Sequence, residues 1–169
     1  KLFHGGHAVA SFDTLRRHDL LRYLFRDTHA VLDTPEGEKI AGFIRRGLEN
    51  TDARIREDKP VTPTFLYAVL LYGPMLRAMQ ARVDAGVPES FAWSEAIDEV
   101  LQGLIRRVAV PKRFTLPLKE LLLLQPRFER RDGRRALALL SHPRFRAAYD
   151  FMLLRTDAGL VSAEIVGRS

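Results

Sequence analysis

Apolar side chains return at helical spacing along most of this chain. The clearest stretch is 97–108, where apolar residues recur every three or four positions and polar side chains fill the opposite face. A second apolar stripe covers 40–48. Thr34 and Pro35 precede it and predict an N-cap followed by a first helical residue. Both stripes are typical of amphipathic α-helices.

The most apolar segment, residues 65–72, has apolar side chains on all faces, which predicts a helix at the centre of the core. Thr62 and Pro63 predict the cap and the first residue of that helix. Because proline cannot donate a backbone hydrogen bond, we expect a kink or a short break at Pro74. A polar loop is expected over 51–62.

The C-terminal third also has a helical pattern. We expect a helix that opens near Thr115 and bends at Pro126. Its inward-facing residues would be Leu118, Leu121, Leu122 and Leu124. Asp132-Gly133 predicts a turn, 134–140 a short helix, and 141–143 the opening of the last helix.

Two short helices are expected near the N-terminus, over 8–15 and 20–25. No convincing run of alternating polar and apolar residues predicts a strand. The sequence therefore predicts a compact all-α domain of roughly seven to nine helices, with no catalytic α/β head.

Positive charge is concentrated in one stretch of the chain. Residues 106–155 carry 13 Lys and Arg side chains against 4 Asp and Glu side chains, whereas residues 1–105 carry 13 against 15. We therefore expect a helical body over 1–108, a basic helical part packed on it over 109–155, and a tail over 156–169. A polyanion, most commonly nucleic acid, suits the basic part, and a merely solvated surface is the alternative.

Arginine predominates in this basic part, and guanidinium groups suit phosphate recognition. The candidate binding residues are Lys112, Arg113, Arg127, Arg130, Arg131, Arg134, Arg135, Arg144 and Arg146. The interleaved aromatic residues are Phe114, Phe128, Phe145 and Tyr149. They could stack on single-stranded bases, although their apolar spacing favours core packing.

The composition limits other chemistry. The chain has no cysteine, which excludes disulfides, a thiolate zinc site and a Cys nucleophile, and suits a reducing, cytoplasmic compartment. Its longest apolar run is far shorter than the ~20 residues of a membrane-spanning helix. His4 and His7 could share a metal, but the glycines between them disfavour the helix that this requires.

No catalytic motif is evident either. We find no glycine-rich phosphate loop and no Asp-x-Asp pair of the kind that holds catalytic metal ions. Glu36 and Glu38 have that spacing, but their place at a helix start explains them better. The His18-Asp19 pair is similar to that of metal-dependent phosphohydrolases, and a plain helix boundary is the simpler interpretation. We therefore predict no catalytic and no metal-binding residue.

Several segments nevertheless resemble one family in the same order along the chain. The most specific is His-Pro-Arg-Phe-Arg-Ala-Ala-Tyr-Asp at 142–150, which follows the arginine-rich string at 124–135. Upstream, the segments 6–8, 50–55 and 63–68 agree as well. Together with Val-Pro-Lys-Arg at 110–113, these segments resemble the C-terminal part of bacterial poly(A) polymerases.

This resemblance implies a role in RNA metabolism. Members of the family add AMP from ATP, with a divalent metal such as Mg²⁺, to RNA 3′ ends, which in bacteria promotes decay. Their catalytic carboxylates lie in an N-terminal head that this chain is expected to lack, so no catalytic residue can be carried over. The implied partners are RNA, bound without sequence preference through the arginine cluster, and the missing catalytic domain.

Two other interpretations remain open at the level of sequence. The chain could be a helical scaffold whose basic face meets an acidic protein rather than RNA. Less favoured is a small metal-dependent phosphohydrolase that uses His18 and Asp19.

Overall fold

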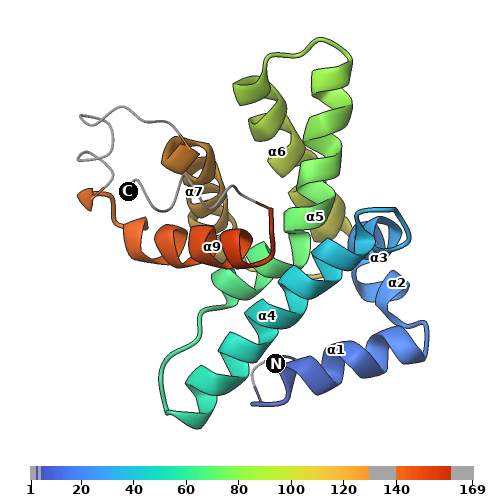
Figure 1. Ribbon diagram of the computed structural model, residues 1–169, viewed down its shortest axis with the longest axis vertical. Helices are drawn as coiled ribbons and strands as arrows, with labels where there is room; N and C mark the ends of the chain where they lie inside the picture. The colour runs from blue at the N-terminus through green and yellow to red at the C-terminus, as the bar shows by residue number, and fades with distance from the viewer. Residues whose placement is uncertain (1–2, 4, 130–139, 161–169) are drawn as a thin grey trace.

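The computed structural model describes residue 3, residues 5–129 and residues 140–160, and these form an all-α fold. The described residues contain eight α-helices and no strand, which confirms the predicted fold class (Figure 1). The helices are α1 (Ala8–Arg17), α2 (Leu21–Leu24), α3 (Arg26–Leu32), α4 (Gly37–Arg56), α5 (Pro63–Asp84), α6 (Glu89–Arg107), α7 (Lys112–Glu129) and α9 (Phe145–Asp157).

Helix α5 is the centre of the molecule, as its apolar sequence predicts. It packs against α3, α4, α6, α7 and α9, and every residue from Ala68 to Met75 is buried. The expected start is confirmed, since the hydroxyl of Thr62 accepts a hydrogen bond from the backbone N–H of Phe65 and Pro63 is the first helical residue.

The sequence predicts a kink or a short break at Pro74; helix α5 continues through this residue, so there is no break. A proline at this position leaves the carbonyl oxygen of Leu70 without its usual donor four residues later. The buried hydroxyl of Thr28 on α3 donates to that oxygen at 2.7 Å. The neighbouring helix thus satisfies the acceptor that proline leaves unpaired.

Helix α4 differs from its prediction at both ends. It begins at Gly37 rather than after a Thr34 cap, because the Thr34 hydroxyl donates back to the carbonyl of Val31 at the end of α3. It also runs to Arg56, through much of the expected loop over 51–62. The carboxylate of Asp52 in this stretch accepts the backbone N–H of Ala8 at 2.7 Å and of Val9 at 3.2 Å. This carboxylate on α4 thus caps the start of α1.

Two glycines let α4 and α5 approach each other closely. A Cβ atom at Gly47 of α4 would lie 2.7 Å from a methyl carbon of Val69, and a Cβ atom at Gly73 of α5 would lie 2.7 Å from a methyl carbon of Ile40. Each helix therefore places a glycine against a branched side chain of the other.

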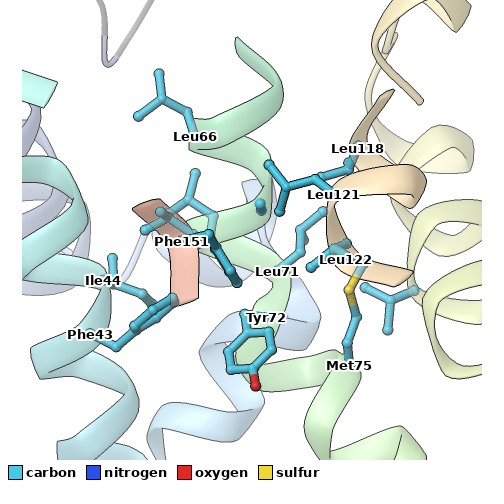
Figure 2. Packing of buried hydrophobic residues seen from close by; sticks show 14 of the residues in the cluster. Phe43, Ile44, Leu66, Leu71, Tyr72, Met75, Leu118, Leu121, Leu122 and Phe151 are labelled. Carbon is cyan, nitrogen blue, oxygen red and sulfur yellow. The ribbon is translucent and has the colours of Figure 1, made fainter. Parts of the chain in front are cut away.

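The C-terminal helices complete the core. Helix α7 begins at Lys112, three residues before the expected Thr115, and continues through Pro126. Its four inward-facing leucines are buried as predicted. Aromatic rings from three helices meet beside them: Phe43 of α4, Tyr72 of α5 and Phe151 of α9 (Figure 2). The expected turn at 132–133 and nearly all of the short helix over 134–140 lie outside the described residues.

Candidate nucleic-acid interface

Helices α7 and α9 pack against each other (Figure 1). The candidate cations that the structure describes belong to these two helices or, for Arg144, to the N-cap of α9. Lys112 and Arg113 are the first two residues of α7, and Arg127 lies near its end. At 1.5 Å per residue, Arg113 and Arg127 are about 21 Å apart along the helix axis. The structure therefore spreads these cations along α7 instead of gathering them at one point.

The cations at the start of α9 are held by carboxylates. Nε of Arg144 lies 3.3 Å from Oε2 of Glu120 on α7, and Nε of Arg146 lies 3.3 Å from Oδ2 of Asp150 on its own helix. His142 stands at the mouth of this helix as expected, where its Nδ1 accepts the backbone N–H of Arg144 at 3.0 Å. The side chain of Arg146 is 88% exposed, so its ion pair with Asp150 is weakened by water.

The start of α7 holds the most available positive charge of this surface. Lys112 and Arg113 are exposed, and neither forms an ion pair with a described residue. The guanidinium of Arg113 lies over the ring of Phe114, 4.8 Å from its centroid. Arg127 is half-buried, again without an ion pair inside the described part of the chain.

The remaining candidates, Arg130, Arg131, Arg134 and Arg135, lie outside the described residues. Their position along the chain is still informative. They come directly after the end of α7, and the chain is described again from Leu140 just before α9. The two helices that flank this arginine-rich stretch pack on each other.

One arginine of the basic stretch points into the protein. Arg155 of α9 is 2% exposed and donates to Oε1 of Gln125 at 2.9 Å, to the hydroxyl of Tyr72 at 3.0 Å and to Oε1 of Glu129 at 3.2 Å. Its Nη2 atom is buried without a hydrogen-bond partner. Burial raises the pKa of the Tyr72 hydroxyl, and the positive charge of Arg155 opposes part of that rise. Arg155 is therefore a structural cation and is unavailable to a ligand.

The aromatic residues of this region pack mainly on one another. The ring centroids of Phe128, Phe145 and Tyr149 lie 5.8–6.2 Å apart in pairs. Phe128 and Phe145 also contact the hydrophobic core. The core-packing interpretation is thus confirmed for these two rings, whereas Phe114 is paired with Arg113.

The acidic and histidine candidates do not come together. In the residues that the structure describes, no group of three or more His, Asp or Glu side chains is placed to hold a metal ion. His18 is the C-cap residue of α1, and Asp19 lies between α1 and α2 and pairs with Arg22 at 3.2 Å, so the two residues occupy a helix boundary. His4 lies outside the described residues, and His7 is the N-cap residue of α1.

Sequence reasoning missed one grouping of cations, which joins α5 and α6. Arg77 on α5 and Arg106 and Arg107 on α6 line a common hollow, although Arg77 is nearly 30 positions away from the other two. Arg77 is an isolated charge in an apolar helix, so only the packing of α5 on α6 reveals the grouping.

None of the helices in the described ranges combines the length and the apolar character that a membrane-spanning segment needs.

Comparison with known proteins shows which family the chain resembles. Residues 85–167 match the family described as the polymerase A arginine-rich C-terminus. The chain is 34% identical over 158 residues to Poly(A) polymerase I of Escherichia coli O6:H1 (strain CFT073) and to that of Salmonella typhi, and 27% identical to that of Haemophilus influenzae. Each match covers 93% of this chain but only 34–35% of the relative, so the chain spans about a third of these proteins. The chain is therefore similar, over nearly its whole length, to the C-terminal region of bacterial poly(A) polymerases, and its second half matches their arginine-rich C-terminus.

Proposed function

We propose that this chain holds RNA for an enzyme that adds AMP from ATP to RNA 3′ ends. The observation that carries the proposal is the match of residues 85–167 to an arginine-rich C-terminal region, together with the exposed cations at the start of α7. ATP and Mg²⁺ belong, on this proposal, to the rest of the enzyme. The chain by itself is expected to transfer no AMP.

The surface formed by Lys112, Arg113, Arg144 and Arg146, here called the α7–α9 basic surface, would contact phosphates. Contacts of this kind ignore base identity and release counterions, so binding weakens steeply as salt rises. The arginines at 130–135 would add to it, since the packed helices α7 and α9 flank them on both sides. Arg155 is excluded because it is buried.

The test compares two charge-matched variants of the full chain. One replaces the four residues of the α7–α9 basic surface with alanine. The other replaces one Lys and three Arg that are exposed on other helices, namely Lys39, Arg17, Arg46 and Arg56. Binding to a fluorescent single-stranded RNA is measured by anisotropy at several salt concentrations.

The salt slope should fall by about 0.7 for each phosphate that the first variant no longer neutralises, and it should stay near wild type in the second variant. Equal slopes in the two variants would remove the α7–α9 basic surface from the proposal. If the wild-type chain binds an acidic protein partner of the enzyme but no RNA at low salt, the chain is a protein-docking scaffold instead. A third variant replaces Arg130, Arg131, Arg134 and Arg135 with alanine. It measures how much the arginine-rich stretch contributes to the salt slope of RNA binding.

A further inference from the structure

A hollow of about 480 Å³ lies between α3, α5 and α6, away from the α7–α9 basic surface. Its size is within the range of small-ligand sites. Apolar side chains from all three helices line it, namely Ala30, Val31, Pro74, Ala78, Ala81 and Val100. Positions 74, 77, 78 and 81 share one face of α5, and this face borders the hollow.

The charges around this hollow are not balanced. Asp27 pairs with Arg107 at 3.1 Å, and Glu99 pairs with Arg82 at 3.2 Å. These two pairs use the two carboxylates that line the hollow. Arg77 and Arg106 also line it, are exposed, and form no ion pair with any residue in the described ranges. The hollow therefore has an apolar floor and two available guanidinium groups, one on α5 and one on α6.

We propose that this hollow binds one nucleotide of a single-stranded RNA, as a second binding site beyond the α7–α9 basic surface. A base is flat and largely apolar on its faces, so it suits the alanine- and valine-lined floor, and the flanking phosphates suit two guanidinium groups. Arg106 is close to the end of α6, and only the segment 108–111 separates that helix from Lys112 on α7. On this proposal, one RNA strand contacts both the start of α7 and Arg106, which are close along the chain.

This inference rests on the proposed function but is tested separately from it. The Arg77→Ala/Arg106→Ala double variant of the full chain is compared with an Arg46→Ala/Arg56→Ala control, which removes the same charge from exposed positions on α4. If each arginine neutralises one phosphate, the salt slope of RNA binding should be lower by about 1.4 in the first variant and unchanged in the control. Equal slopes overturn the inference, and the α7–α9 basic surface keeps its role if its own variant binds RNA more weakly.

Two further measurements locate the nucleotide. Alanine-methyl NMR during titration with AMP should shift Ala30, Ala78 and Ala81, whereas Ala10 on α1 should not move. Adenosine, which lacks the phosphate, should produce much smaller shifts.

Ala81→Phe would fill the hollow while keeping both arginines, and should abolish the AMP-induced shifts at Ala30 and Ala78. Shifts that persist in this variant, or that are absent with millimolar AMP in the wild type, show that the hollow is not a nucleotide site.

Discussion

The hydroxyl of Thr28 donates a 2.7 Å hydrogen bond to the carbonyl of Leu70, and this carbonyl is the one that Pro74 leaves without a helical donor. Thr28→Val keeps the shape of the side chain but removes the donor. Since a buried acceptor without a partner costs about 1–3 kcal/mol, the free energy of unfolding should fall by that amount in urea denaturation.

A second substitution separates this mechanism from a simple packing defect. Thr28→Ser retains the hydroxyl and should retain most of the stability. In a Pro74→Ala background the residue at 74 can donate to Leu70 itself, so Thr28→Val should cost less there than in the wild type. An equal cost in both backgrounds contradicts the link between Thr28 and Pro74.

The buried guanidinium of Arg155 predicts an unequal response to removing either member of its ion pair. Glu129→Gln leaves the buried positive charge without a carboxylate, and should destabilise the fold by about 2 kcal/mol because Glu129 is itself partly exposed. Arg155→Met removes the charge together with the unpartnered Nη2 atom, and should cost no more than Glu129→Gln. Thermal unfolding ranks the two, and a much larger destabilisation in Arg155→Met would contradict this account.

Tyr72 makes the stability of the fold depend on pH in the alkaline range. Its pKa is raised in the folded state, chiefly by burial, so the unfolded chain loses this proton at a lower pH than the folded protein does. The resulting stability is fully present below the ordinary tyrosine pKa of about 10 and is lost as pH rises through the folded value. In an ultraviolet titration one of the four tyrosines should ionise later than the others, and Tyr72→Phe should remove that late step.

The close approach of α4 and α5 predicts opposite effects for two glycines of one helix. Gly47→Ala should cost about 1–3 kcal/mol, because the new methyl group would lie 2.7 Å from Val69, and Val69→Ala should recover part of that stability. Gly42→Ala meets no atom within 4 Å and should stabilise the helix by up to about 1 kcal/mol. Urea denaturation of both variants measures their free energies of unfolding. A Gly42→Ala protein that is less stable than the wild type would contradict the predicted opposite effects.

The sequence predicts a helix correctly where the apolar face of that helix alone determines its bounds. It fails where the helix depends on a contact with a residue far away along the chain. The apolar stripes of α6 and α7 and the capped start of α5 are local features, and each is confirmed. Helix α3 is absent from the prediction because only Thr28 and Val31 of its seven residues are buried, too few for a recognisable apolar stripe. The hydrogen bond of Thr28 to Leu70 is not visible in any local pattern either. Likewise, the polar end of α4 has the pattern of a loop because its Asp52 serves α1.

The same limit applies to the candidate interface. Charge counting found the basic stretch, but it could not separate Lys112, which is exposed, from Arg155, which is buried. Nor could it place Arg77 beside Arg106, because that neighbourhood depends on the packing of α5 against α6. Sequence spacing identifies cations on one helix, whereas the surface that a ligand meets is built from several.

The pairing of Asp52 with the first two amides of α1 also determines where this protein can be shortened. Asp52 is 7% exposed in the full chain, and a truncated form that starts at α2 would leave its carboxylate without these two backbone donors. A shortened form would therefore need an uncharged residue in place of Asp52, for instance Asp52→Ala, for the remaining helices to stay folded. The N-terminal helix is thus an integral part of the folding unit and not a removable extension.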